Sequence, residues 1–127
     1  MNRKILKAFG GKLIGSKRRK FFVVTTVEKM PQDIIDFLTH TTWFVSSMED
    51  AWGFTFTGND LKNQHLIFLS DELFYESANQ IRFTIAHEIG HVILRHRNSI
   101  FSMQSKKEVE FQEKQADKFA EKYFPKP

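Results

Sequence analysis

A chain of 127 residues, 41% of them hydrophobic, is long enough to bury a core and short enough to form one domain. It contains no cysteine, which excludes disulfides and thiolate metal sites, leaves histidine and carboxylate as the main metal ligands, and fits a reducing, cytoplasmic location. The net charge of +4 is divided unevenly: residues 1–30 hold nine Lys or Arg against one Glu, and residues 31–127 hold ten against fourteen Asp or Glu. We therefore expect a basic N-terminal arm over residues 1–30 and a main domain over residues 31–127.

The first twenty residues form a cationic segment whose apolar residues recur at helical spacing, which predicts an amphipathic helix. These apolar residues are Ile5, Leu6, Phe9, Leu13 and Ile14. Such a segment can bind a nucleic acid backbone or an anionic membrane surface; the alternative is a helix that docks on the domain with its basic face in solvent. The chain has no apolar run long enough to span a membrane, and residues 1–20 lack the continuous apolar core of a secretory signal.

The next segment predicts one short strand and one helix. Residues 21–27 are rich in β-branched and aromatic residues, which favours a strand, with a continuation of the basic helix as the alternative. Pro31 then opens a helix, because proline is well tolerated in a first helical turn. That helix is expected to end at His40.

Three strand-like runs follow, at residues 42–46, 52–57 and 65–69. The turn residues Gly58-Asn59-Asp60 separate the last two runs and predict that these pair as an antiparallel hairpin. The fold class is therefore expected to be α+β, with a short, mostly antiparallel three-stranded sheet packed on helices.

The stretch from residue 81 to residue 96, IRFTIAHEIGHVILRH, has a helical pattern and carries two histidines four residues apart. Four residues are just over one helical turn, so His87 and His91 project from one face and can bind one Zn²⁺ ion. Glu88 lies slightly off that line, where it can reach a water at an open position of the metal. This is the H-E-x-x-H arrangement of zinc hydrolases.

Two features of this helix argue against a chance match to so short a motif. Its core face is supplied by aliphatic residues, so the histidines are not needed to complete an apolar stripe. These residues are Ile85, Ile89, Val92 and Ile93. Gly90 weakens the helix by about 1 kcal/mol relative to Ala, and its missing side chain would let another element approach the metal.

The last segment predicts a second long helix. Ser105 and Glu108 have the spacing of a capping box, which opens a helix from about residue 106 to residue 123. Its apolar stripe consists of Ala116, Phe119, Ala120 and Tyr123.

Two carboxylates on the edge of that stripe are candidates for the metal site. Glu113 and Asp117 lie four residues apart and face whatever the stripe packs against. If it packs on the histidine helix, Glu113 supplies the third ligand, and Asp117 accepts the free ring N–H of a ligating histidine. Glu110, one turn earlier, is the competing third ligand.

His96 follows the motif closely but does not fit a third-histidine pattern. One class of zinc proteases places a third histidine beyond a glycine spacer, and Leu94 stands where that glycine would be. We expect His96 to be a cation near the C-terminus of the helix, where the helix dipole favours it.

Three stretches together resemble the ImmA/IrrE family of zinc metallopeptidases. They are the strand Trp52-Gly53-Phe54 followed by HLIFLSDEL, the sequence RFTIA leading into HEIGHVILRH, and the late EKQADKFAEKYFP, which is similar to the family's E-x-x-A-N-x-F-A segment. The resemblance implies a small zincin-like domain over residues 31–127 with a gluzincin-like site. In that site His87, His91 and Glu113 bind Zn²⁺ and Glu88 acts as the general base.

The resemblance also implies a reaction, the site-specific cleavage of a regulatory protein of the repressor type. Glu88 would take a proton from the metal-activated water and pass it to the leaving amine. The strand at residues 65–69 is expected to be the edge strand that pairs with an extended substrate. Tyr75, Tyr123 and His96 are the candidates for stabilising the oxyanion.

The alternative function belongs to another class. Members of that family commonly continue through further helices beyond the proline that corresponds to Pro125. This sequence stops two residues after Pro125. The alternative expectation is therefore a catalytically reduced, zincin-like regulatory protein that acts through protein or DNA contacts.

Overall fold

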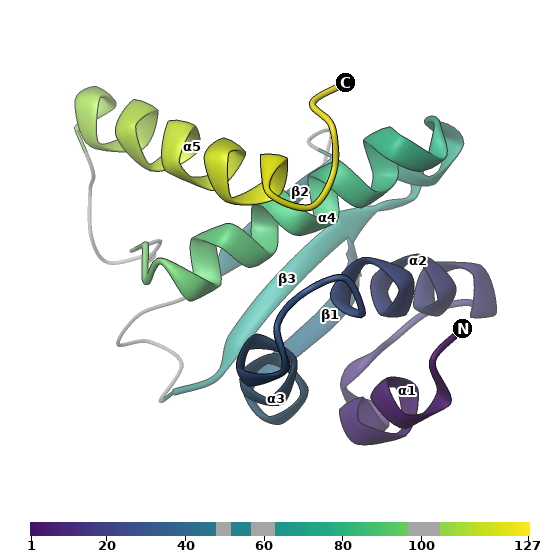
Figure 1. Ribbon diagram of the computed structural model, residues 1–127. Coiled ribbons are helices and arrows are strands. Elements are labelled where there is room, and N and C mark those ends of the chain that lie inside the picture. The colour runs from purple at the N-terminus through teal and green to yellow at the C-terminus, as the bar shows by residue number, and fades with distance from the viewer. Residues whose placement is uncertain (48–51, 57–62, 97–104) are drawn as a thin grey trace.

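The computed structural model describes residues 1–47, 52–56, 63–96 and 105–127, and it shows an α+β fold in which helices pack against a small sheet (Figure 1). In chain order the elements are α1 (Arg3–Phe9), the 3-10 turn η1 (Gly10–Lys12), α2 (Lys17–Val27), α3 (Gln32–Thr41), β1 (Thr42–Ser47), β2 (Gly53–Phe56), β3 (His65–Ser70), the 3-10 turn η3 (Asp71–Tyr75), α4 (Ala78–Ile93) and α5 (Lys106–Glu121). Helix α4 contacts β2, β3, α2 and α5. The helix with the histidine motif is therefore the centre of the packing.

The sheet has three strands in the order β1-β3-β2 and is mixed. The pair β1–β3 is parallel, with Thr42 opposite His65, and the pair β2–β3 is antiparallel, with Phe54 opposite Phe68. The predicted hairpin is confirmed, although its turn at residues 58–60 lies outside the described residues. The expectations of a mostly antiparallel sheet and of β3 as an edge strand are wrong. A strand's own residues predict that it forms, whereas its neighbours depend on how the whole chain packs.

Residues 21–27 form the second half of helix α2, so the predicted strand is wrong and the alternative, a continued basic helix, is confirmed. Ser16 caps the helix by accepting a hydrogen bond from the backbone N–H of Arg19. Its apolar side chains include Val23, Val24 and Val27, which are almost fully buried, and α2 packs beside α4. Burial of this face outweighs the β propensity of the valines and phenylalanines, which is a weak preference.

The basic N-terminal segment is docked on the domain. Ile5, Phe9 and Leu13 are buried in the same core as the apolar residues of the later helices and strands. The rings of Phe9 and Phe44 pack edge to face at 5.7 Å, and the backbone N–H of Ile14 donates to the carbonyl of Phe44 on the outer side of β1 at 2.9 Å. The apolar face of the segment is therefore largely covered.

Helices α3 and α5 begin where the sequence predicts, and a serine caps the start of α4. Pro31 precedes α3, Ser77 accepts a hydrogen bond from the N–H of Gln80 at the start of α4, and Ser105 accepts one from the N–H of Glu108 at the start of α5. The predicted stripe of α5 is buried at Ala116, Phe119 and Ala120, with Tyr123 partly buried beyond the end of the helix. Among the described residues, no helix is long and apolar enough to cross a bilayer.

Candidate metal centre

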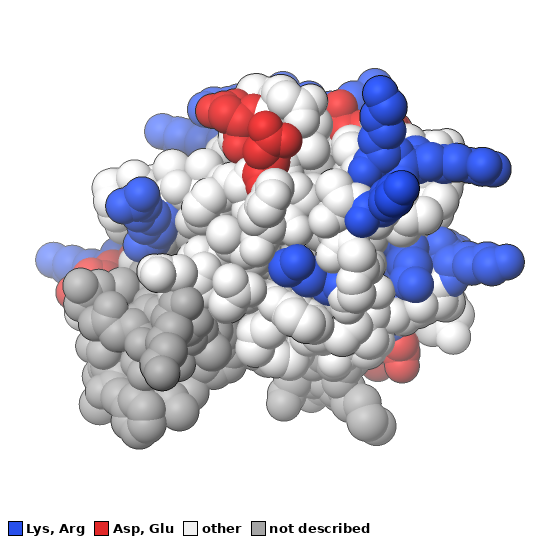
Figure 2. Space-filling model, turned by 90° about the horizontal axis from the view of Figure 1, so that it is seen from below, with Lys and Arg blue, Asp and Glu red and all other residues white. Residues whose placement is uncertain are grey.

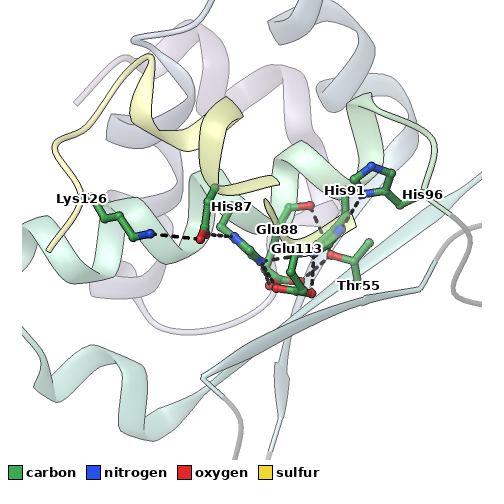
Figure 3. A network of polar contacts seen from close by, with 8 residues as sticks. Thr55, His87, Glu88, His91, His96, Glu113 and Lys126 are labelled. Carbon is green, nitrogen blue, oxygen red and sulfur yellow. Dashed lines mark hydrogen bonds and ion pairs between the residues drawn. The ribbon is translucent and has the colours of Figure 1, made fainter. Parts of the chain in front are cut away.

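Three side chains from α4 and α5 converge on one point (Figure 3). The Nε2 atom of His87 lies 2.8 Å from Oε2 of Glu113, and the Nε2 atom of His91 lies 3.1 Å from Oε1 of the same carboxylate. The two Nε2 atoms are 3.2 Å apart. The two histidines of the motif and the predicted third residue therefore direct one potential ligand atom each to a common centre.

The separation of the two imidazole nitrogens fits a zinc ion. With metal–ligand bonds of about 2.0–2.2 Å, the corners of a tetrahedral zinc site lie about 3.3 Å apart. The two Nε2 atoms, 3.2 Å apart, match one edge of such a tetrahedron, and the Glu113 carboxylate meets each of them with a different oxygen. Two imidazoles and one carboxylate also form a donor set of catalytic zinc sites, in which the fourth position stays open for water or substrate.

The close packing of α4 on α5 brings Glu113 to the histidines. Gly90 lies between them in sequence, and a Cβ atom there would be 3.2 Å from both the Cα atom of Ala116 and the Cβ atom of Phe119. Neither neighbour is the mobile end of a long side chain. Gly90 was expected to let another element approach the metal, and α5 is the element that lies against it, beside the two histidines.

Asp117 lies behind His87. Its Oδ1 atom is 2.7 Å from Nδ1 of His87, and its Oδ2 atom is 3.5 Å from the amine of Lys126. A hydrogen bond from Nδ1–H to Asp117 leaves the Nε2 lone pair of His87 facing the common centre. This is the position that the sequence predicted for Asp117.

His96 occupies the corresponding place behind His91, which the sequence did not predict. It is only 6% exposed, its Nδ1 atom lies 2.8 Å from Nδ1 of His91, and its Nε2 atom lies 2.7 Å from Oε1 of Gln115 on α5. Burial lowers the pKa of His96, which favours the neutral ring at pH 7. The expectation of a cation near the C-terminus of the helix is therefore wrong.

Glu88 is buried beside the three converging side chains and is held by β2. Thr55 donates its hydroxyl to Oε1 of Glu88 at 2.8 Å, and the Oε2 atom lies 3.8 Å from Nε2 of His87. Gly53 leaves room for this side chain, because a Cβ atom at position 53 would be 3.2 Å from Cγ of Glu88. Neither Thr55 nor Gly53 was predicted as a site residue, since a threonine and a glycine in a strand carry no spacing signal that points to a helix.

The charges within the site are coupled. Hydrogen bonds from His87 and His91 hold the pKa of Glu113 far below its usual value. Burial lowers the pKa of His87, but its hydrogen bonds to Glu113 and Asp117 and the charges of Glu88 and Glu113 outweigh this and raise it. Burial is the largest effect on Glu88 and raises its pKa, against the opposing influence of both histidines and Thr55. Without a cation, the site therefore favours a shared proton between imidazole and carboxylate.

A comparison with protein families matches residues 46–124 to Peptidase U49, which is more than half of the chain. The chain belongs to the Peptidase U49 family. The matched region contains every residue of the converging cluster and both histidine partners. Membership of a peptidase family, together with a His-His-Glu cluster suited to a metal, indicates peptidase chemistry. No curated protein and no solved structure matches the chain.

A pocket of about 300 Å³ opens next to the cluster in this Peptidase U49 domain. It is lined by two residues of the cluster, His87 and Glu113, and by Trp52, Gly53, Gln80, Phe83, Thr84, Glu88 and Asp117. Two of the three potential metal ligands, His87 and Glu113, thus line a pocket that opens to solvent, as the site of an enzyme must.

The other sequence candidates lie outside the cluster. Glu110 is exposed on α5 and is not part of the His-His-Glu group. Tyr75 is 87% exposed beside a different pocket, with Arg18 and Phe74, and the ring of Tyr123 packs on Phe119. Among the described residues, neither tyrosine lines the pocket at the cluster.

Proposed function

We propose that the chain is a zinc-dependent metallopeptidase that hydrolyses peptide bonds, with His87, His91 and Glu113 as metal ligands and Glu88 as the catalytic base. The observation that carries the proposal is the convergence of these three ligand atoms, all within 4.8 Å of one another, beside a buried glutamate. Membership of the Peptidase U49 family supports the reaction class.

The chemistry divides between the metal and the chain. When bound, Zn²⁺ supplies Lewis acidity, which lowers the pKa of a bound water from 15.7 to about 7 and polarises a carbonyl. Glu88 accepts the proton of the attacking water and delivers it to the leaving amine. Thr55 occupies Oε1 of Glu88, so Oε2, which faces His87, is the atom that carries the proton. The raised pKa of Glu88 suits this transfer, because a stronger base accepts the proton more readily.

The substrate would bind along β2. Because β3 lies between the other two strands, the edge of the sheet next to the pocket is β2, and its residue Gly53 lines that pocket. An extended peptide can pair with the backbone of an edge strand, and alternate side chains then enter neighbouring pockets. Trp52 and Phe83 would give the pocket a preference for an apolar side chain.

The substrate class follows from the resemblance to the ImmA/IrrE family alone. It is a regulatory protein of the repressor type, cleaved at one site. An exposed, extended segment in such a protein would be cut most readily, since β-strand pairing requires an unfolded stretch.

A purified chain tests the proposal in three measurements. We expect one zinc ion per chain by metal analysis, cleavage of a repressor encoded next to this gene, and loss of cleavage with a chelator.

Glu88→Gln should keep the zinc and lose turnover by about 10²- to 10⁴-fold, the usual contribution of general acid–base catalysis. Glu110→Gln, on an exposed carboxylate of the same helix, is the matched control and should retain activity. Normal turnover by Glu88→Gln would refute the assignment.

A second candidate function is favoured by the charge of the N-terminal segment. Lys and Arg side chains gather on the right of Figure 2, the side on which α1 and α2 lie in Figure 1. Among the described residues of this segment, Arg19 forms an ion pair with Asp71, and none is seen for the other cations. Because the apolar face of α1 is buried in the core, a membrane would meet mainly charge. We propose contact with a nucleic acid backbone as the alternative role.

Salt dependence of binding tests this second role. Affinity for duplex DNA should fall steeply between 50 and 200 mM salt if several phosphates are neutralised. Lys4→Glu with Lys7→Glu should weaken binding, whereas Lys106→Glu with Lys107→Glu, two exposed lysines at the start of α5, should leave it unchanged. Equal binding by both double variants, or tighter binding to anionic vesicles than to DNA, would rule out this surface as a nucleic acid site.

A further inference from the structure

His96 is placed by the way helix α4 ends. The helix closes with two hydrogen bonds, from the N–H of His96 to the carbonyl of His91 at 3.0 Å and from the N–H of Arg95 to the carbonyl of Val92 at 3.2 Å. Arg95 has a φ of 57°, the left-handed conformation that this C-terminal motif requires. The motif turns the chain back on itself, so that the residue two positions after the C-cap residue Leu94 lies against the last turn of the helix. That residue is His96, and it lies against His91.

The ring contacts define a chain of three side chains. Nδ1 of His91 meets Nδ1 of His96 at 2.8 Å, and Nε2 of His96 meets Oε1 of Gln115 at 2.7 Å (Figure 3 shows the first of these). A metal bound at Nε2 of His91 requires that the proton of this ring sits on Nδ1. His96 must then accept at Nδ1 and carry its own proton on Nε2. The carbonyl oxygen of Gln115 is the acceptor that this proton needs.

We infer that His96 is a positioning residue, which with Gln115 fixes the tautomer and the ring orientation of His91 for metal binding. This inference rests on the proposed metal site and adds a partner to it. His87 is oriented by the carboxylate of Asp117, whereas His91 is oriented by a neutral ring that is itself held by an amide. Asp117 contacts His87 directly, and Gln115 acts on His91 through His96; both come from α5, so the helix that supplies the third ligand also helps to orient both histidines.

Two substitutions separate the hydrogen bond from simple packing. His96→Phe keeps an aromatic ring and removes both nitrogens, whereas His96→Asn places an amide oxygen near the position of Nδ1 and can still accept. We expect the zinc affinity, measured by competition with a chromogenic chelator, to fall about 10- to 100-fold in His96→Phe. His96→Asn should recover most of this loss. His40→Phe, at an exposed histidine of α3, is the matched control and should bind zinc normally.

A direct reading of the tautomers completes the test on the zinc-loaded wild-type protein. In long-range ¹H–¹⁵N spectra of the imidazoles, we expect the proton of His91 on Nδ1 and that of His96 on Nε2. A His96 protonated on Nδ1, or equal zinc affinity of the wild type and His96→Phe, would overturn this inference and leave the metal site intact. His96→Asn as weak as His96→Phe would also overturn it. Failure of the wild type to bind zinc would overturn both this inference and the proposed function.

Discussion

Gly90 of α4 lies so close to Ala116 of α5 that the two helices meet almost backbone to backbone. The contact falls between His87 and His91 in sequence, and Glu113 is one turn before Ala116. The distance between the helix axes at this point therefore sets the distance between Glu113 and the two imidazoles. Sterics at one glycine thus control the geometry of the site.

A side chain at position 90 should open the site. Gly90→Val would push α5 away, because the atoms nearest to the new Cβ belong to the backbone of Ala116 and the base of the Phe119 side chain. We expect a loss of stability of about 1–3 kcal/mol, typical of overpacking, and at least a tenfold loss of zinc affinity. Thermal unfolding and chelator competition measure these effects. Gly11→Val is the control, since no atom lies within 4 Å of a Cβ atom there; equal behaviour of both variants would contradict the steric argument.

Thr55 should affect turnover and leave zinc binding unchanged. Thr55→Val keeps the shape of the side chain and removes the hydroxyl that donates to Glu88. Because that hydrogen bond lowers the pKa of Glu88, the acidic limb of the pH–rate profile should move to higher pH. We expect kcat to fall about tenfold from the misplaced base. A variant with reduced zinc content would show instead that Thr55 supports the fold of the site.

Asp117 should tune the affinity for zinc through its acceptor oxygen. Asp117→Asn retains an oxygen at 2.7 Å from Nδ1 of His87 if the amide is turned that way, whereas Asp117→Ala removes it. We expect a small loss for the first and a 10- to 100-fold loss for the second. Lys126→Ala removes the other partner of Asp117 and should bind zinc like the wild type. Equal affinities of the two Asp117 variants would show that its charge, and not its acceptor oxygen, is what matters.

The metal-free protein should have its own pH dependence. The folded state raises the pKa of His87, so the stability it contributes is present below its ordinary pKa of about 6.5 and is lost as the pH rises through the folded value. The lowered pKa of Glu113 contributes stability above its ordinary pKa of about 4.5 that is lost at lower pH. The melting temperature difference between the wild type and Glu113→Gln should therefore be largest between about pH 4.5 and 6.5.

Two other histidines make this difference measurement necessary. Burial lowers the pKa values of His65 and His96, so their contributions to stability change with pH in the opposite sense to that of His87. The wild type and Glu113→Gln both retain these two histidines. Zinc affinity should instead rise with pH over the same window, because the metal competes with protons for the imidazoles. If the melting temperature difference between the wild type and Glu113→Gln grew from pH 6 to pH 8, it would contradict the raised pKa of His87.

The sequence predicted the parts of the site that local signals encode. His87 and His91 share a helical face, Ser105 marks the start of α5, and Glu113 and Asp117 lie on the edge of its apolar stripe. Together these placed the three converging residues and one histidine partner without any knowledge of the tertiary structure. The wrong expectations concern packing between distant segments, because local propensity does not determine it.

His96 shows most clearly what was missing. The left-handed residue that closes α4 is Arg95, whereas glycine is the usual signal for this turn. Without that signal, nothing in the sequence indicated that the chain folds back over His91. The strand order and the helical packing of residues 21–27 could not be predicted from the sequence either. The strand order depends on the pairing of β1 with β3, and the packing of residues 21–27 depends on contact with α4.

The alternation of Glu113, Gln115 and Asp117 along α5 gives the helix a single register on α4. Each of these side chains contacts a different set of imidazoles, so a slip by one residue would break all of the contacts together. Metal removal would leave α5 held by the buried Ala116, Phe119 and Ala120 and by these hydrogen bonds. If the proposed metal binds here, its loss would weaken the attachment of α5 to α4, and limited proteolysis with and without zinc would then cut α5 faster in the metal-free protein.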